Sequence, residues 1–599
     1  MLKDKKIIFS LTALGFLILI LGLHGGSEYY FRDFCVHKTL NMFYNFGSPE
    51  FFKKPSFISD ILAVVYGFFY FFLKIFNVAP NFDEFARLFT TNYIETPIGN
   101  ISFMLPALIV NNVFALIGVF FTFLTTYILT DKKVLPSFIS GFILSTTYGW
   151  MNFSHHLAVD LPLSAMCIMT VFFALYFIQN KTSYTYKNII VLGVLSGLCA
   201  STKYNGALVL ITPLLVILLT EKSKKQFLYK SFAFILCSLF AFFITNIHIL
   251  IKFKHFFSDF LFEYNHAFIY GHQSADDSTP FLYHLFHSIP NLVGITTFIL
   301  SIIGGSLFLF AKNIPTKIKC TLIIFPLSFY LMMSFSKLIF LRYMLPIIPY
   351  LIIFVGFLIN YILKSVKSKI FYSVCITLMA VFLCFNGVNA LHFYKIMNYK
   401  DSRVEIKNIF KTLNYGNPNL IFYSDIFSNP YYEEDFLNQF PYLKEDIKKF
   451  LYYANNHSIE IVPKKHKDIL KEYDVLFFDS NTYDRSMQVR KDSRYEKLEN
   501  QYFMYRPFRY DNFMMDGTGV QLYVAQINPY SVDKDKVPFD FLRSDFKYRK
   551  FRGPFVEIYF KDEKLRDDFV KKCNESALEC KSLNMEDGYY YNNIVYNLQ

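Results

Sequence analysis

Residues 24–55 read HGGSEYYFRDFCVHKTLNMFYNFGSPEFFKKP and follow directly on an apolar segment, Ile7–Leu23. This stretch places Glu28, Arg32 and Asp33 a few residues beyond a segment of membrane-spanning length. Charged groups so close to hydrocarbon are costly unless a polar site uses them. An ordinary solvated loop is the alternative for each residue taken alone. Further polar clusters fall on the same side of the membrane, and they favour a site.

The composition is that of a polytopic membrane protein with a polar appendage. Of 599 residues, 53% are hydrophobic and 20% aromatic, while only 18% are charged, which excludes an ordinary soluble protein. The formal charge of +13 could suggest nucleic acid as a partner. The lysines, however, lie in short clusters between apolar segments, where they act as topology signals. We therefore expect membrane lipids, and no nucleic acid, among the partners.

The nine cysteines are scattered, most of them in or near apolar segments, where cysteine acts as a small hydrophobic residue. Only Cys573 and Cys580 lie close together in a polar region. Neither has a C-x-x-C or histidine partner, which argues against a metal site. A disulfide between them is an option if that region is extracytoplasmic.

The apolar stretches are too many for the core of a soluble protein. The first follows a basic N-terminus and lacks a small-residue cleavage site, so it predicts an uncleaved span with a cytoplasmic N-terminus. A buried core helix is the alternative for any single stretch, but not for about a dozen in succession. The others are Phe57–Phe76, Ile101–Thr130, Val134–Phe153, Leu161–Ile178, Ile189–Ser201, Tyr204–Thr220, Phe232–Ile251, Ile289–Ala311, Leu322–Phe335, Met344–Leu363 and Ile370–Phe385.

The short basic loops orient these stretches. If Phe57–Phe76 spans the membrane, every basic loop falls opposite the N-terminal lysines; if it lies in the interface, all are cytoplasmic with them. This segment carries Asp60 and Lys74 and follows a proline, which suits an interfacial helix. We therefore predict about eleven spans in the plasma (inner) membrane, with this helix inside a first external loop of about residues 24–100. The basic loops are Lys132–Lys133, Lys181–Lys187, Lys222–Lys230, Lys312–Lys319 and Lys364–Lys369.

This topology brings the loops rich in His, Asp and Glu to one face, outside the cytoplasm. The grouping follows from the positions of the lysines in the loops and does not depend on any sequence motif. The loops are Glu28–Pro55, Ser154–Asp160, Ser201–Asn205, His255–His287 and Ser336–Arg342.

The pattern changes after about residue 395, where charged residues become frequent and apolar runs shrink to strand length. Strands and helices alternate there, which predicts a small α/β domain over residues 396–599 beside a transmembrane domain over residues 1–395. By the parity of the spans, the α/β domain is extracytoplasmic. The predicted strands are Leu420–Tyr423, Ile459–Val462, Val475–Phe478, Val520–Ala525 and Val556–Phe560, and the predicted helices are Arg403–Leu413, His466–Tyr473 and Glu563–Cys573.

Two adjacent histidines and a carboxylate, His155, His156 and Asp160, lie at the mouth of a span in the stretch SHHLAVDLP. They could bind a divalent metal ion (Mg²⁺, Mn²⁺ or Zn²⁺) or a metal-bound phosphate. The alternative is a set of interfacial residues in which Asp160 caps the helix that begins before Pro162. The residues alone favour neither.

Two cations are candidates for a phosphate site. Lys203 lies among hydroxyl groups in STKYNG, which interrupts an apolar run, and Arg342 lies at the outer end of a span. A lysine at a helix break and a bidentate arginine both suit phosphate. The alternatives are a polar hairpin with a snorkelling lysine and an interfacial arginine beside the belt residue Tyr343.

The loop His255–His287 holds five of the 13 histidines. Within it, Glu263 and His266 are three residues apart, so on a helix they share one face and could hold one metal ion. His272 follows shortly after. Scattered surface histidines are the commoner explanation for such a loop.

Together these residues form a site that fits a lipid-linked anionic substrate, whose tail stays in the bilayer while its phosphate meets Lys and Arg. A carboxylate is then free to deprotonate an acceptor hydroxyl. The cations, or a metal ion, stabilise the departing phosphate.

Several stretches carry a family resemblance: HGGSEYYF, KKPSF, SHHLAVDLP, GLCASTKYNG, FEYNHAFIYGH and LRYMLPIIPY. By these stretches and their order, residues 1–395 resemble the GT-C-type integral membrane glycosyltransferases, close to the protein O-mannosyltransferases and the aminoarabinose transferase of lipid A. The C-terminal RGPFVEIYF resembles the end of some prokaryotic members. The resemblance implies a GT-C-like fold and inverting transfer of a sugar from a polyprenyl phosphate-linked donor to an extracytoplasmic protein, lipid or glycan.

The resemblance also implies a catalytic base, ligands of the donor phosphate, and ligands of a metal ion or the donor. The candidates for the base are Glu28 and Asp33. The candidates for the phosphate ligands are Lys54, Lys203, Tyr204, Arg342 and Tyr343. The candidates for ligands of a metal ion or the donor are His155, His156, Asp160, Glu263, His266 and His272.

This chain departs from the family pattern at two positions. After the first span the family usually has Asp-Glu, with the aspartate as the presumed base, whereas this chain has Ser27-Glu28. Either Glu28 or Asp33 takes over, or the chemistry is impaired. A single proline, Pro55, stands where Lys-Pro-Pro is common.

Two other functions compete with the enzyme. A flippase or transporter for lipid-linked saccharides needs polar residues along a path through its spans, whereas the apolar stretches here are free of such a path and the polar groups gather at one face. A non-catalytic relative is the other alternative, suggested by Ser27.

Overall fold

The computed structural model describes residues 5–23, 39, 42–49, 52–86, 88, 105–155, 157–179, 185–270, 280–338, 340–365 and 368–397. Beyond these it describes residues 406, 409, 412–413, 422–424, 475–479, 523–527, 556–560, 562–576 and 580–583. Two compact units make up the chain. One comprises Met1–Pro80, Met104–His272 and Ser278–Tyr394, and the other comprises Asn81–Phe103, Gln273–Asp277 and Lys395–Gln599.

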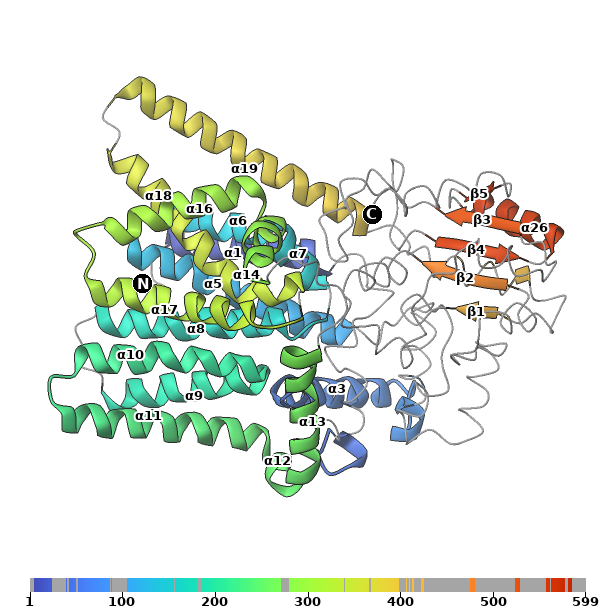
Figure 1. The fold of residues 1–599 in the computed structure, drawn as a ribbon, viewed down its shortest axis with the longest axis horizontal. Helices are drawn as coiled ribbons and strands as arrows, with labels where there is room; N and C mark the ends of the chain where they lie inside the picture. Colours follow the sequence, from blue (N-terminus) through green and yellow to red (C-terminus); the bar gives the residue numbers. More distant parts are fainter. Residues whose placement is uncertain are drawn as a thin grey trace. The chain divides into compact units, whose positions relative to one another are not determined.

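The first unit is a bundle of helices (Figure 1). Its 3₁₀ segments are η2 and η5, and its π-helical segments are η3 and η4. In chain order the elements are α1 (Lys5–Leu23), α3 (Phe57–Ile75), α5 (Leu105–Leu129), α6 (Val134–Thr146), α7 (Tyr148–His155), α8 (Asp160–Gln179), α9 (Tyr186–Thr202), η2 (Tyr204–Leu210), α10 (Ile211–Thr220), α11 (Lys224–Thr245), α12 (Ile247–Ile251), α13 (Phe253–Asn265), η3 (His266–Tyr270), α14 (Pro280–Tyr283), η4 (His284–Ser288), α15 (Ile289–Val293), α16 (Ile295–Phe310), α17 (Thr316–Ser334), η5 (Leu341–Ile347), α18 (Ile348–Ser365) and α19 (Lys369–Met397).

The chain is a multi-pass membrane protein. Among the described residues, seven helices are long and apolar enough to cross a membrane, or eight if Pro280–Val293 and Ile295–Phe310, bent by 112°, form one span. Phe57–Ile75, which we predicted to be interfacial, meets the same criteria of length and composition. The predicted count of about eleven spans and the predicted orientation stay predictions.

Several predicted stretches are interrupted. The apolar stretch Val134–Phe153 is two helices with a break at Thr147, and Phe232–Ile251 breaks at Asn246. A count of apolar residues does not register such breaks, because one polar or extended residue barely changes the average over a span.

Several predicted loops are wrong in their extent, among them Lys312–Lys319, because α17 begins at Thr316. The basic loop Lys222–Lys230 ends early, because α11 begins at Lys224. The loop His255–His287 is largely helical in its described part, because α13, η3, α14 and η4 occupy it. Helix α13 carries polar and aromatic side chains together and crosses the direction of α9, α10 and α11 (Figure 1). Because of this mixture, the segment does not stand out as an apolar stretch in the sequence, so it was not predicted to be a helix.

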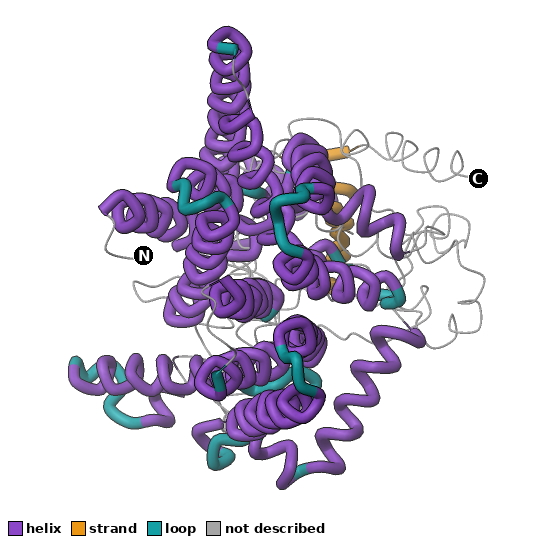
Figure 2. Tube along the Cα trace, turned by 90° about the vertical axis from the view of Figure 1, so that its left-hand side faces the viewer, coloured by secondary structure: helices purple, strands orange, loops and turns teal. Residues whose placement is uncertain are grey.

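Helix α8 lies at the centre of the packing that positions the site. Most of its side chains are buried, and it packs against α5, α9 and η5. Helix α9 in turn packs closely on α11, where a Cβ on Gly197 would lie only 2.3 Å from the Ser238 carbonyl oxygen. Figure 2 looks along several of these bundle helices.

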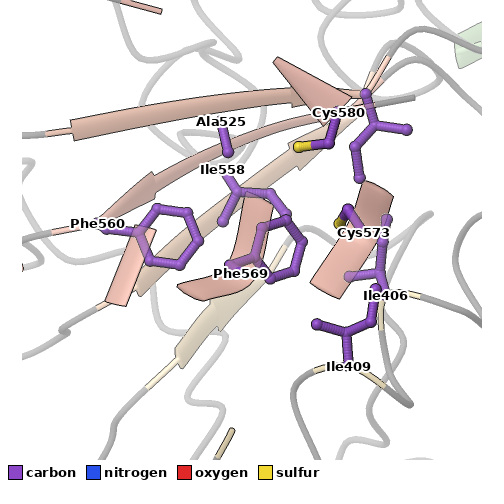
Figure 3. Packing of buried hydrophobic residues seen from close by; sticks show 9 residues of the cluster. Ile406, Ile409, Ala525, Ile558, Phe560, Phe569, Cys573 and Cys580 are labelled. Carbon is purple, nitrogen blue, oxygen red and sulfur yellow. The ribbon is translucent and has the colours of Figure 1, made fainter. Parts of the chain in front are cut away.

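The second unit contains, in its described part, a five-stranded mixed sheet of order β1-β2-β4-β3-β5. Only β1 and β2 pair in parallel; the other pairs are antiparallel. Helix α26 (Glu563–Glu575) packs on the sheet, and side chains of both form a hydrophobic cluster with residues 406 and 409 (Figure 3). The strands are β1 (Phe422–Ser424), β2 (Val475–Asp479), β3 (Tyr523–Ile527), β4 (Val556–Phe560) and β5 (Cys580–Leu583).

Four predicted strands coincide with observed ones within a few residues, and the predicted helix Glu563–Cys573 coincides with α26. Strand β5 was not predicted, because CKSL is too short and polar to show an apolar run. Ile459–Val462 and His466–Tyr473 lie outside the described residues. That residues 396–599 form an extracytoplasmic α/β domain stays a prediction.

Candidate functional site

Three charged side chains meet where helices begin or end. Asp160 is the first residue of α8, Lys203 separates α9 from η2, and Arg342 lies in the first turn of η5. The backbone of Lys203 is extended, with φ −156° and ψ 137°. Gly206 tightens this break, since a Cβ there would lie 2.3 Å from the Cys199 carbonyl oxygen. The interruption predicted at STKYNG is thus confirmed.

The carboxylate of Asp160 contacts both cations. Nζ of Lys203 donates to Oδ1 of Asp160 at 2.7 Å, and Nε of Arg342 lies 3.5 Å from Oδ2. The side chain of Asp160 is 3% exposed, that of Arg342 9% and that of Lys203 19%. Two positive charges thus surround one negative charge in a largely buried cluster. Lysine and arginine side chains both form charge-assisted hydrogen bonds with anions such as phosphate, so this cluster has the chemistry of an anion-binding site.

Aromatic rings cover the two cations. Nζ of Lys203 lies 4.2 Å from the centroid of the Tyr343 ring, and the guanidinium carbon of Arg342 lies 4.5 Å from that of Phe340. The electron-rich ring faces stabilise the cations. The low exposure of the two cations also strengthens their attraction to an anion. Tyr343, predicted as a phosphate ligand, contacts Lys203 through its ring.

The positive charge of Lys54 affects the pKa of Lys203 in this cluster. Burial lowers the pKa of Lys203, while the Asp160 carboxylate acts in the opposite direction. The positive charges of Arg342 and Lys54 lower this pKa further, because nearby like charges disfavour the protonated form. The structure therefore brings three of the five predicted phosphate ligands (Lys203, Arg342 and Tyr343) together around Asp160, and the charge of a fourth, Lys54, acts on Lys203. Their role stays a prediction.

The hydroxyl of Tyr204, the fifth predicted phosphate ligand, donates its hydrogen bond to a backbone carbonyl oxygen. Its hydroxyl donates to the carbonyl oxygen of Phe52 at 2.7 Å. Its ring packs edge-on against Phe256 and Phe260 of α13. A hydrogen bond from Tyr204 to phosphate would require the bond to Phe52 to break.

His155 ends α7 and is 2% exposed. Its ring lies 5.7 Å from that of Phe393 in α19. The side-chain amide of Asn111 in α5 donates to the carbonyl oxygens of Phe153 and Ser154 at 2.9 Å, which fixes the end of α7. This packing suits a structural role for the imidazole as well as the predicted ligand role.

Glu263 lies in the last turn of α13, and His266 begins η3. Burial lowers the pKa of His266, and the charge of Lys53 lowers it further, so the neutral imidazole is favoured. Within the described ranges, no group of three or more His, Cys, Asp or Glu side chains could hold a metal ion. The predicted metal ion stays a prediction.

Glu28, Asp33, His156 and His272 lie outside the described residues. The catalytic base therefore also stays a prediction.

Two polar residues that the sequence analysis did not single out contact the segment around Lys54. The backbone N–H of Phe52 donates to Oδ2 of Asp259, and the N–H of Ser56 donates to Oδ1 of Asn246, both at 2.8 Å. Asn246 carries a signal in the sequence, since it is a polar residue inside an apolar run. Asp259 carries none beyond its charge.

Comparison with known proteins identifies part of the chain. Residues 98–251 match the sequence profile of the family described as dolichyl-phosphate-mannose-protein mannosyltransferase. This segment contains Asp160 and Lys203 and ends before Arg342. A search of curated proteins finds no match.

Solved structures of three proteins resemble the fold at low similarity. ArnT from Cupriavidus metallidurans in the apo state has a TM-score of 0.45 at 12% identity and covers 93% of this chain and 98% of its own. An Archaeoglobus fulgidus oligosaccharyltransferase tethered with an acceptor peptide has a TM-score of 0.45 at 9% identity, covering 83% and 72%. The Saccharomyces cerevisiae protein O-mannosyltransferase Pmt1-Pmt2 complex bound to the sugar donor has a TM-score of 0.30 at 12% identity, covering 42% and 34%.

The profile match confirms the resemblance that the sequence motifs indicated. Over residues 98–251, the chain is similar to the family described as dolichyl-phosphate-mannose-protein mannosyltransferase.

Proposed function

We propose that this protein transfers a sugar from a polyprenyl phosphate-linked donor to an extracytoplasmic acceptor. The observation that carries the proposal is the buried cluster in which Lys203 and Arg342 surround Asp160 at 2.7 Å and 3.5 Å. The name of the matched family, which includes dolichyl-phosphate-mannose, supports a lipid phosphate sugar as the donor class.

The position of the cluster suits a lipid-linked anion. Asp160 and Lys203 stand at the ends of the apolar helices α8 and α9. A polyprenyl chain can remain beside such helices in the bilayer while its phosphate reaches the cations at their ends. Lys203 and Arg342 then donate charge-assisted hydrogen bonds to phosphate oxygens.

The transfer is a single displacement at the sugar C1. The bond between C1 and the phosphate oxygen breaks, and the phosphate takes the electron pair and leaves as polyprenyl phosphate. The acceptor hydroxyl oxygen bonds to C1 from the opposite face, which inverts the configuration, and its proton passes to a carboxylate. Glu28 is the proposed base, with Asp33 as the fallback. Lys203 and Arg342 stabilise the charge that develops on the phosphate.

The residues described around Asp160 do not fit a metal ion well. Both carboxylate oxygens of Asp160 face cations, so neither is positioned to bind a second kind of cation. The charge stabilisation that a divalent ion would provide is supplied here by Lys203 and Arg342.

The orientation is part of the proposal. The N-terminus is cytoplasmic, and residues 396–599 and the site are outside the plasma (inner) membrane. This places the acceptor in the extracytoplasmic space.

The proposal is tested with purified protein in lipid nanodiscs and a panel of polyprenyl phosphate-linked hexoses and pentoses. Extracytoplasmic proteins, lipids and glycans are supplied as acceptors, and the release of free polyprenyl phosphate is measured. We expect one donor to be consumed in an acceptor-dependent reaction. Binding of polyprenyl phosphate without consumption of any donor would identify a non-catalytic relative, and absence of binding would refute the proposal.

A further inference from the structure

A short basic segment, Phe52–Ser56 with the sequence FKKPS, is hydrogen-bonded at both ends to side chains that are distant in sequence. We name this segment the basic strap. At its start, the N–H of Phe52 donates to Oδ2 of Asp259 in α13 at 2.8 Å. At its end, the N–H of Ser56 donates to Oδ1 of Asn246, at the junction of α11 and α12, also at 2.8 Å. The partners are 207 and 190 residues away in sequence, so these bonds are tertiary contacts of the fold.

A third hydrogen bond fixes the start of the basic strap from another element. The hydroxyl of Tyr204 in η2 donates to the carbonyl oxygen of Phe52 at 2.7 Å. Both backbone groups of Phe52 are therefore bonded to side chains. The ring of Phe52 also meets that of His255 edge-on, with a centroid distance of 5.1 Å.

Asn246 is itself held firmly. It is 1% exposed, and its amide nitrogen donates to Oγ of Ser201 at 2.5 Å and to the carbonyl oxygen of Phe242 at 2.8 Å. Ser201 lies two residues before Lys203 in α9. Asn246 therefore links the end of the basic strap to α9, the helix that ends directly before Lys203.

The basic strap presents its two lysines between these bonds. Nζ of Lys53 lies 3.8 Å from the centroid of the Phe262 ring in α13. The charge of Lys54 acts on Lys203. Pro55 fixes one backbone angle between Lys54 and the bond at Ser56. The path of the segment is thus determined on both sides of Lys54.

We infer that Asp259 and Asn246 are positioning residues: they hold the basic strap, which carries Lys54, against Tyr204 and Ser201 on either side of Lys203 and so present Lys54 to an incoming lipid phosphate. The inference rests on the proposed function. A lysine on an unrestrained segment loses conformational freedom when it binds a phosphate, whereas a lysine on a preorganised segment loses less, so its contact contributes more to affinity.

The test measures binding of a short-chain polyprenyl phosphate to the full-length protein in detergent. Asp259→Leu removes the acceptor at similar volume, whereas Asp259→Asn keeps a carbonyl oxygen that accepts from Phe52. Asn246→Leu removes the bond at the other end. We expect each leucine variant to bind the lipid roughly tenfold more weakly and Asp259→Asn to keep most of the affinity.

The matched control for Asn246 is Asn386, which donates to the carbonyl oxygen of Phe382 four residues earlier at 2.8 Å, as Asn246 does to Phe242. Asn386 lies in α19 and is 8% exposed. Asn386→Leu should leave the affinity unchanged. The fluorescence of Trp150, the chain's single tryptophan, reports whether each variant is folded.

A double-mutant cycle separates positioning from general destabilisation. If Asp259 acts through Lys54, Asp259→Leu should add little to the loss caused by Lys54→Ala, because the two changes remove the same contact. Additive losses in the folded variants would overturn the inference, as would normal binding by Asp259→Leu. If the wild-type protein binds no polyprenyl phosphate, the proposed function fails and the role of the basic strap fails with it.

Discussion

The charge of Asp160 can be removed without changing the shape of its side chain. Asp160→Asn leaves Lys203 and Arg342 close together in a site where their side chains are only 19% and 9% exposed. Removing one partner of a buried ion pair costs about 3–5 kcal/mol, because the remaining charge is buried without compensation. We expect the free energy of unfolding of the ligand-free protein to fall by that order.

A lipid phosphate should reverse much of this loss. If the phosphate binds Lys203 and Arg342, it supplies the negative charge that the variant lacks. Ligand at about 100 times its dissociation constant adds about 2.7 kcal/mol to the stability of the form that binds it. We therefore expect polyprenyl phosphate to stabilise Asp160→Asn more than it stabilises the wild type.

The assay is thermal unfolding in detergent, followed by the fluorescence of Trp150. This residue is 1% exposed, and its indole N–H donates to the carbonyl oxygen of Ala115 at 3.3 Å. The matched control is Asp131→Asn, because Asp131 and Lys364 form an exposed ion pair at 2.6 Å, and such pairs contribute about 0–1 kcal/mol. If Asp160→Asn is no less stable than Asp131→Asn, or if polyprenyl phosphate stabilises it less than the wild type, the reasoning is refuted.

Three further predictions address the cations, the base and the pH dependence. Lys203→Ala and Arg342→Ala should each lower donor efficiency about ten- to a hundredfold, since a charge-assisted hydrogen bond contributes about 1.5–3 kcal/mol; unchanged turnover of both at limiting donor would contradict a phosphate role. Glu28→Gln should abolish sugar transfer while donor lipid still binds, with Asp33→Asn milder; near-normal turnover of Glu28→Gln would exclude Glu28 as the base. Because burial and Lys53 lower the pKa of His266 from 6.5, stability from its neutral form is present above about pH 6.5 and is lost as the pH falls through its folded pKa. His266→Gln should flatten that part of the curve of unfolding temperature against pH, and an unaltered curve would argue against the burial of this imidazole.

The sequence predicts the helical bundle because apolar length is a strong signal for membrane proteins. It also places Asp160, Lys203 and Arg342 on one face, since the positions of the basic loops constrain the topology. The contact between Asp160 and Lys203 could not be predicted, because it joins residues 43 positions apart through the packing of α8 on α9.

The hydrogen bonds that hold the basic strap could not be predicted either. Asp259 accepts from a backbone N–H, and any residue type could supply that donor, so no pattern of side chains marks the contact. The sequence predicts a loop where α13 lies for a related reason: the phenylalanines of α13 alternate with Lys, His, Asp and Glu in a way that resembles an irregular segment. The position of Tyr204 beside Lys203 predicts a phosphate ligand, whereas in the structure its hydroxyl donates to the carbonyl oxygen of Phe52.

The central claim is that the phosphate of a polyprenyl donor binds at Lys203 and Arg342. The most direct test is an experimental structure of the full-length protein with bound polyprenyl phosphate. We expect density for the phosphate within hydrogen-bond distance of Nζ of Lys203 and of the Arg342 guanidinium, with the lipid tail along the apolar helices. A phosphate bound elsewhere, with the contacts of Asp160 to both cations unchanged, would contradict it.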